Sequence, residues 1–242
     1  MFKKSWVIFA YILSSSTFLS SFAYASQYYA QLEVGSSDQN NDASTKQGAI
    51  RSDQAKTVKK LSETDYLRIN IGHQITNTFR AYSYFQMDDS PELNYKHFST
   101  VSQQVNGQPT ELKAREKIQL QKKDYQLGAG ADYLYPVTEK WTLSTGAQVG
   151  MYLSEVTFSN DVKIRNIKGM KENIGQNSTN SGLTAGVSAG IGYDVNDQWK
   201  LETGARYSVF DNNRHSLSYF PNKTHYTFKN ATQYQVSASY QF

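Results

Sequence analysis

The residues near the end of the chain that could perform chemistry are a histidine and two serines. His215, Ser216 and Ser218 lie in the run from Arg214 to Asn222. A histidine beside a serine can support acyl transfer when an acidic side chain orients the histidine. No Asp or Glu occurs between Asn222 and Phe242. The run therefore suggests a hydrolase only if another strand supplies the acid.

Other kinds of reactive site find little support. The 242-residue chain has no Cys, which excludes disulfides and thiolate metal sites, and His73 and His97 have no zinc-ligand spacing. The run Asp38–Asp42 lacks the Gly and terminal Glu of a calcium loop. A net charge of +4 is too small to suggest nucleic-acid binding. We therefore expect no cofactor, no metal and no nucleic-acid partner.

The N-terminus has the layout of a secretory signal peptide. Lys3 and Lys4 precede a mostly apolar run, which the small-x-small triplet Ala23-Tyr24-Ala25 closes. We expect cleavage before Ser26, so that residues 1–25 are removed and residues 26–242 form one domain. The alternative is an uncleaved membrane helix, but the apolar run is short and rich in Ser.

The C-terminal segment alternates between two kinds of side chain. Thr232, Tyr234, Val236, Ala238, Tyr240 and Phe242 occupy one set of alternate positions, and Ser or Gln fills the other. Successive residues of a strand point to opposite sides, so one face of this strand meets an apolar medium and the other a polar one.

A hairpin pattern repeats in the interior. The runs Thr138–Ala147 and Asn196–Ala205 each combine a short polar turn with a strand that opens on Trp141 or Trp199. A weaker copy surrounds residues 76–78. Aromatic residues flank these turns, at the level expected of a membrane interface. The predicted aromatic girdle consists of Phe79, Tyr135, Trp141, Tyr193 and Trp199.

These turns imply eight strands. The first covers about residues 27–35, three pairs surround the three turns, and the eighth is terminal. Long polar segments at 36–63, 88–124, 155–180 and 211–229 separate them. The sequence therefore predicts an all-β fold, an eight-stranded antiparallel up-and-down transmembrane barrel with three short periplasmic turns and four long extracellular loops.

The alternation also predicts which charges face the lumen. The inward set contains Glu33, Arg68, Arg80, Asp132, Lys200, Glu202 and Arg206. Buried charges must pair, and neighbouring strands suggest Glu33 with Arg68 and Arg80 with Asp132. We interpret the set as a plug that keeps the barrel closed; the alternative is a gate for a narrow ion path.

A soluble barrel of the lipocalin kind would show the same alternation with its apolar face inward. The polar face here is rich in Gly and small hydroxyl side chains, which suit a crowded lumen better than a solvated surface. The membrane orientation is therefore favoured.

The leader, the Trp-led hairpins, the alternating strands and the terminal Tyr240-x-Phe242 together resemble the small outer-membrane barrels of the OmpA transmembrane domain, OmpX, Ail/Lom and Opa group. The resemblance covers the mature chain and transfers no site residue. It implies a monomer in the Gram-negative outer membrane, with Tyr240 and Phe242 as part of the signal for the barrel insertion machinery. It also implies a non-enzymatic protein that acts through its loops in adhesion, host contact, lipopolysaccharide contact or envelope integrity.

Two of the polar segments carry cations that could serve such a function. Lys and Arg neutralise phosphate and sulfate, so these loops could bind lipopolysaccharide or acidic host glycans. The candidate residues are Lys163, Arg165, Lys168, Lys171, Arg214, His215 and Lys223.

The second function class is a lipid A-modifying hydrolase. The run Arg214–Asn222 resembles the His-x-Ser-Asn segment of the lipid A 3-O-deacylase family, including a Pro-Asn shortly afterwards. It departs from that segment because Leu217 occupies the Ser position.

Overall fold

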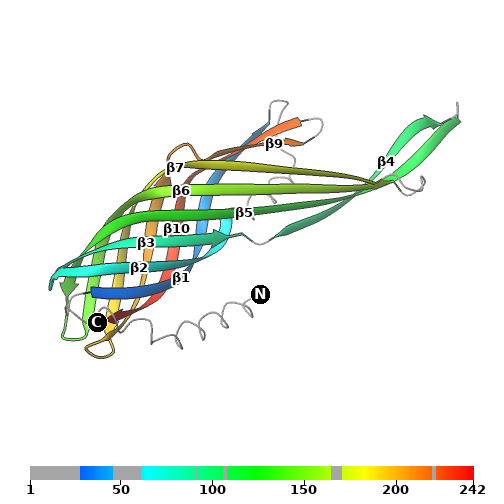
Figure 1. Ribbon diagram of the computed structural model, residues 1–242. Helices are drawn as coiled ribbons and strands as arrows, with labels where there is room; N and C mark the ends of the chain where they lie inside the picture. Colours follow the sequence, from blue (N-terminus) through cyan, green and yellow to red (C-terminus); the bar gives the residue numbers. More distant parts are fainter. Residues whose placement is uncertain (1–27, 46–60, 91, 106–107, 165–170, 220–221) are drawn as a thin grey trace.

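Eight antiparallel strands close into a barrel in the computed structural model (Figure 1). The structure describes residues 28–45, 61–90, 92–105, 108–164, 171–219 and 222–242. Ten strands occur in this part of the chain: β1 (Tyr28–Thr45), β2 (Glu63–Thr76), β3 (Phe79–Asp89), β4 (Leu93–Val105), β5 (Gln108–Pro136), β6 (Trp141–Ile164), β7 (Lys171–Asp194), β8 (Trp199–Phe210), β9 (Arg214–Tyr219) and β10 (Asn222–Gln241).

The closed ring runs β1-β2-β3-β5-β6-β7-β8-β10, and pairing of β10 with β1 completes it. At the seam the Phe242 amide donates to the Tyr28 carbonyl at 3.0 Å, so the two chain ends of the ring meet. β4 pairs only with residues 108–120 of β5, and β9 pairs only with β10. The predicted eight-stranded barrel is confirmed, with two additional hairpin strands outside the ring.

The side chains alternate as the sequence predicted. Leu127, Val149 and Met151 point outward and are 64%, 64% and 65% exposed, whereas Arg68, Gln86 and Gln126 point inward and are buried. An apolar exterior with a polar interior is the arrangement of a transmembrane barrel, because only the outward residues contact lipid. The lipocalin orientation is therefore wrong for this chain.

Side-chain capping explains the repeated hairpin. The Asn196 side chain accepts hydrogen bonds from the Gln198 and Trp199 amides at 2.9 and 2.8 Å. Thr138 plays the same part in the other copy, accepting from the Trp141 amide at 3.1 Å. Asn and Thr side chains close tight turns in this way. The position three residues before each Trp therefore fixes the turn.

The aromatic girdle lies at this short-turn end. Trp141 stacks against Tyr193 with ring centroids 4.9 Å apart, and Trp199 lies 5.0 Å from Tyr240. Phe79 and Tyr135 are exposed beside them. The Phe242 ring packs against Tyr240 at 5.2 Å. The role of Tyr240 and Phe242 in membrane insertion remains a prediction.

Glycine and tyrosine face each other across neighbouring strands inside the barrel. A Cβ atom on Gly130 would lie 2.6 Å from the Tyr82 ring, and one on Gly128 would lie 2.7 Å from Tyr84. Real side chains do not approach so closely, so a larger residue at either position requires neighbouring atoms to move. The glycines thus make room for the tyrosines that fill the lumen.

The outward apolar band ends at similar heights on neighbouring strands. Met87 is followed by Asp89 on β3, Tyr125 is preceded by Lys123 on β5, and Leu153 is followed by Glu155 on β6. Residues beyond these positions, among them Asp88, Lys122 and Asp124, lie on the extracellular side of the membrane-spanning segments.

The four segments that the sequence predicted as long loops are in large part strand. β1 continues to Thr45, β5 begins at Gln108, and β6 and β7 continue past the apolar band to Ile164 and from Lys171. Their backbones pair with neighbouring strands, although no lipid imposes an apolar outer face there. The prediction failed because it recognised strands by an apolar face.

Among the described residues, no helix is long and apolar enough to cross a membrane.

Candidate functional site

The barrel interior holds a network of buried ion pairs. Arg206 forms a bidentate pair with Glu33, its Nη1 and Nη2 donating to the two carboxylate oxygens at 2.8 and 3.0 Å. The Tyr66 hydroxyl donates to the same carboxylate at 2.8 Å. Both charged side chains are almost completely buried. A bidentate guanidinium–carboxylate contact of this kind is among the stronger protein hydrogen bonds.

A second set of pairs centres on Arg80. Its Nε donates to Asp132 at 2.9 Å, which is the expected partner, and its Nη1 contacts Glu202 at 3.1 Å. The Gln31 side chain also donates to Glu202 at 2.5 Å. One guanidinium therefore bridges two carboxylates contributed by β5 and β8.

Arg68 does not pair with Glu33, which corrects the expectation from sequence. Its guanidinium stacks on the Tyr84 ring, 3.7 Å from the centroid, and its Nε donates to Asn70 at 2.7 Å. Glu33 is taken by Arg206 instead. A planar guanidinium stacks favourably on an aromatic face, which satisfies a cation that has no carboxylate in contact.

Lys200 lies outside this network. It is half-buried near the short-turn end and pairs with Asp194 at 3.2 Å. The remaining lumen charges, three arginines and three carboxylates, balance. The void among Glu33, Arg80 and Arg206 measures about 20 Å³, which is room for about one water molecule. This void is smaller than a hydrated ion, and the role of the charges as a plug stays a prediction.

A second polar group lies at the extracellular mouth. We define the mouth cluster as Gln39, Lys122, Asp124, His215 and Phe228. The Lys122 ammonium contacts the Asp124 carboxylate and donates to the Gln39 side chain at 2.8 Å. Gln39 in turn donates to Asp124 at 3.0 Å. The ammonium also lies 4.5 Å from the centroid of the Phe228 ring.

A small apolar core covers the mouth cluster. Leu61, Leu120, Val156 and Phe158 are buried together, with Tyr226 packed against them. This mouth core combines residues of β5, β6 and β10 with Leu61, which precedes β2. It places apolar side chains next to the mouth cluster, since Val156 lies opposite Lys122 in the ladder of β5 and β6.

Burial changes the ionisation of the mouth groups. Burial, together with the neighbouring Asp124 carboxylate, raises the pKa of Asp88 to about 7. Burial also opposes ionisation of Asp124, but the Lys122 ammonium and the Gln39 hydrogen bond outweigh it and hold the pKa of Asp124 below its usual value. Burial and the Lys122 charge lower the pKa of His215.

His215 is buried, contrary to the expectation that it is a ligand-binding loop residue. β9 folds over the mouth, and the His215 Nε2 lies 3.0 Å from both the Ser154 hydroxyl and the Asn213 side-chain oxygen. Ser216 turns away and contacts His225 Nδ1 at 2.7 Å. His215 and its neighbouring serine thus face different surroundings and do not form a nucleophile–base pair.

The mouth residues Asp88, Lys122 and Asp124 were missed because they fall in a segment interpreted as a loop. A signal for them exists in the sequence. Leu120, Lys122 and Asp124 continue the inward alternation that includes Asp132, so the period of two extends past the last outward aromatic residue. Only the outward set changes from apolar to polar there.

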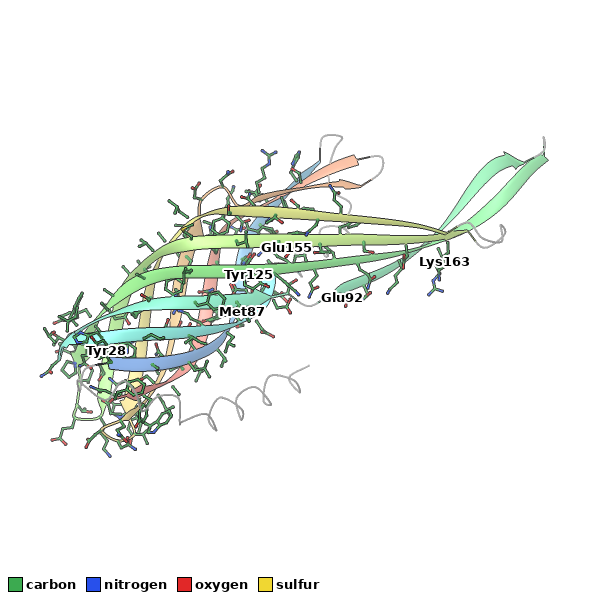
Figure 2. All side chains as sticks on the ribbon, viewed as in Figure 1. Tyr28, Met87, Glu92, Tyr125, Glu155 and Lys163 are labelled. Atoms are coloured by element: carbon green, nitrogen blue, oxygen red, sulfur yellow. The ribbon has the colours of Figure 1, made fainter. Side chains whose placement is uncertain are left out.

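The most prominent extracellular feature is a long extension, which we call the arm. The arm consists of β4 with residues 108–122 of β5, 155–164 of β6 and 171–180 of β7. Figure 2 shows Met87 and Tyr125 near the end of the barrel, Glu155 and Glu92 beyond it, and Lys163 close to the far end of the paired strands. At ~3.3 Å per residue, the 10 arm residues of β6 extend up to about 33 Å.

The candidate ligand-binding cations are placed as follows. Lys163 is exposed on the arm and Arg214 is exposed at the start of β9. Lys171 begins β7 and Lys223 lies in β10. Arg165 and Lys168 lie outside the described residues, as do the signal-peptide residues Ala23, Ala25 and Ser26.

A closed antiparallel barrel with an apolar exterior, a packed ionic interior and strands that continue past one end defines a small outer-membrane β-barrel protein. A family model described as "Helicobacter outer membrane protein" matches residues 68–242. The chain belongs to this family, and its place is the outer membrane of a Gram-negative cell.

Several solved structures are similar in outline. Neisserial surface protein A shows 16% identity over 89% of this chain and 97% of that one, with a TM-score of 0.47. Outer membrane protein OprG from Pseudomonas aeruginosa shows 12% identity over 90% and 96%, with a TM-score of 0.45. Ail of Yersinia pestis shows 12% identity over 88% and 98%, with a TM-score of 0.40. No curated protein matches the chain by sequence.

Proposed function

We propose that this protein is a non-enzymatic outer-membrane anchor that acts through its arm, by contact with acidic glycans on a facing cell surface. The observation that carries the proposal is the combination of a barrel whose lumen holds buried, paired side chains with strands that continue up to about 33 Å past the lipid band. A barrel filled with side chains offers no route for a solute, so the work must be done outside it.

The charge of the arm indicates the chemistry of its partner. The arm residues, 93–105, 108–122, 155–164 and 171–180, contain seven Lys or Arg against five Asp or Glu. Among the described side chains, Arg115 and Lys163 are exposed. Such an excess attracts sulfated or carboxylated saccharides, because Lys and Arg neutralise anionic groups.

The length of the arm favours a partner outside the bacterial membrane. Lipopolysaccharide phosphates lie at the level of the lipid headgroups, near Lys123 and Glu155, where the apolar band ends. Lys163 is separated from Glu155 by eight residues of extended strand, which is about 26 Å at ~3.3 Å per residue. The far part of the arm is therefore distant from the headgroups and is placed to contact a facing cell surface.

Deletion of the arm tests the proposal. Residues 95–118 and 160–174 are each replaced by Asn-Gly, which joins Asn94 to Gln119 and Ser159 to Gly175 at positions already paired in the sheet. Binding of the nanodisc-embedded protein to heparin beads and to epithelial cells is compared with binding of the parent. We expect at least a tenfold loss. Undiminished binding would contradict the proposal.

Two further variants separate charge from shape. Arg115→Gln with Lys163→Gln keeps the arm and reduces its charge, so heparin binding should weaken and lose part of its salt dependence. Asp161→Asn removes an acidic charge from the same strand and serves as the matched control. Heat-modifiable gel migration establishes that each variant forms a barrel.

The ion-path alternative is tested by measuring the conductance of the protein in planar bilayers. The void among the central charges has a volume of about 20 Å³. We expect planar-bilayer conductance at the baseline for the parent protein. Stable single-channel steps from the parent protein would support the ion path instead.

A further inference from the structure

A polar cleft lies at the seam of the barrel, away from the arm. Its volume is about 360 Å³, and the described residues that line it are Asp38, Gln39, Asn40, Asn41, Ser62, Asn230 and Thr232. These come from β1, β10 and the start of the β2 region. The volume falls within the range of small-molecule sites.

A β-bulge shapes this cleft. Asn40 pairs with Asn230 and Asn41 pairs with Phe228, so Lys229 has no opposite residue on β1. A bulge bends its strand and redirects nearby side chains, and bulges recur beside binding sites. Lys229 points out of the ladder and pairs with Asp42 at 2.5 Å, with both side chains largely exposed.

The cleft lining is hydrogen-bonding and almost uncharged. Four of its seven residues carry side-chain amides, two carry hydroxyls, and Asp38 alone carries a charge. Amides donate and accept, and a carboxylate accepts from two neighbouring hydroxyls. No Lys or Arg is among the described lining residues. This composition suits the hydroxyls of a neutral sugar, and none of the described lining side chains is a cation that phosphate or sulfate could bind.

The outward residues of the cleft offer available polar groups. Gln39 is 1% exposed and turns its side chain to the lumen, where Lys122 and Asp124 hold it, so it lies on the opposite face of β1 from Asp38 and Asn40. Within the described part of the chain the side chains of Asp38, Asn40 and Asn230 hydrogen-bond to no other residue. Polar groups on two paired strands, held in place by the ladder and left available, are a pre-organised arrangement for a ligand.

The position of the cleft limits the source of the sugar. Asp38 pairs with Thr232, two residues beyond the pair of Ser36 with Tyr234, whose ring is exposed to lipid. Two residues of strand span about 7 Å. The cleft therefore lies just outside the apolar band, where the first sugars of an outer-leaflet glycolipid stand.

We propose that the seam cleft binds neutral saccharide through Asp38, Asn40, Asn230 and Thr232. The recognised chemistry is a set of vicinal hydroxyls, which either a glycolipid of the cell's own outer leaflet or an oligosaccharide from outside presents. The proposal does not depend on the function of the arm, because the arm and the cleft share no residue.

The test measures saccharide binding to the full chain in nanodiscs of synthetic phospholipid, by isothermal titration and saturation-transfer NMR. The two probes are dephosphorylated core oligosaccharide from lipopolysaccharide, and lacto-N-tetraose as a neutral external sugar. Binding of the first probe alone identifies a glycolipid site, and binding of the second alone identifies a site for external sugar. The proposal would be overturned if neither probe binds at a concentration of roughly 10 mM, which is about the weakest useful affinity for a sugar.

Variants connect any binding to the cleft. Asp38→Ala should weaken binding about 10- to 100-fold, since it removes a charged acceptor, and Asn230→Ala about 3- to 10-fold. Asp42→Ala, which changes an exposed carboxylate on the same strand outside the cleft, is the control and should bind as the parent does. Equal binding by all three would place the sugar elsewhere.

Two additional measurements distinguish direct sugar recognition from binding through a cation and from binding by the arm. Binding that disappears with EDTA would overturn direct recognition of hydroxyls in favour of a bound cation. The variant without the arm should retain full saccharide binding, so the cleft can succeed where the proposed function of the arm fails, and the reverse.

Discussion

Replacing Glu33 by Gln should destabilise the barrel strongly, because it leaves Arg206 buried without a counter-charge. Both guanidinium contacts to Glu33 are short, at 2.8 and 3.0 Å, and the pair is almost fully buried. An amide of the same shape keeps the hydrogen bond from Tyr66 but cannot balance the cation. Removing one member of a buried pair costs about 3–5 kcal/mol.

The assay is reversible urea unfolding in lipid vesicles, followed by tryptophan fluorescence and by heat-modifiable gel migration. A loss of 3–5 kcal/mol corresponds to about a 100- to 5000-fold fall in the folding equilibrium constant, at ~1.4 kcal/mol per factor of ten. Both readouts should give the same midpoint if unfolding is two-state.

The double variant Glu33→Gln with Arg206→Met gives the decisive comparison. It removes both charges, so it should recover a large part of the stability that the single change loses, since a buried pair contributes little net stability over apolar groups of similar volume. A single change that costs less than about 1 kcal/mol would refute the reasoning, as would a double variant no more stable than Glu33→Gln.

Four further predictions follow from the turns, the lumen and the mouth. Asp88→Asn should stabilise the barrel relative to the parent increasingly as the pH rises from about 4, the ordinary carboxyl pKa, to about 7, the pKa of Asp88 in the folded protein, because the folded state then has to ionise a buried acid; urea midpoints at pH 4, 6 and 8 measure this. Asn196→Ala should cost about 1–2 kcal/mol in the same assay, because two turn amides lose their acceptor. Gly130→Ala should cost about 1–3 kcal/mol through overlap with Tyr82, and Tyr82→Leu should recover part of that loss. Mass spectrometry of the protein from outer membranes should show a mature N-terminus at Ser26.

Each of these predictions has a contrary outcome. A stability difference for Asp88→Asn that is independent of pH would mean that Asp88 titrates normally in the folded state, because only a raised folded pKa makes stability fall as the pH rises. Asn196→Asp retains the acceptor, so a loss equal to that of Asn196→Ala would locate the effect elsewhere. Gly130→Ala at parental stability would mean that Tyr82 moves freely. An intact N-terminus would indicate an uncleaved leader.

The ring strands could be predicted from the sequence because lipid imposes a rule on every one of them. Most outward residues between the girdle and the edge of the band are apolar, so the period of two is visible without a partner strand. The inward charges could be predicted for the same reason. The pair of Arg80 with Asp132 was also predictable, since these residues lie directly opposite on β3 and β5.

The partner of Glu33 could not be predicted from neighbouring strands. Arg68 lies directly opposite Glu33 on β2, yet it stacks on Tyr84. Arg206 reaches Glu33 from β8, across β10, whose Gln233 lies opposite Arg206 and whose Ser237 lies opposite Glu33. Pairing by register assumes that side chains reach only the next strand, and a long guanidinium that spans a whole strand breaks that assumption.

At the mouth of the barrel, the alternation of side chains continues past the membrane edge, but its outward positions become polar. From Tyr125 to Lys123 the outward side of β5 passes from apolar to charged, while the inward side keeps Lys122 and Asp124 buried. Beyond the lipid band, the packing of protein side chains, including those of the mouth core, therefore decides which residues are buried. β1 connects this region to the seam cleft, since Gln39 turns inward to Lys122 and Asp124, while Asp38 and Asn40 on either side of it turn outward into the cleft. Loss of the contacts around Gln39 should therefore displace β1 and weaken binding in the cleft, so variants of Asp124 belong in folding assays before they are used in binding assays.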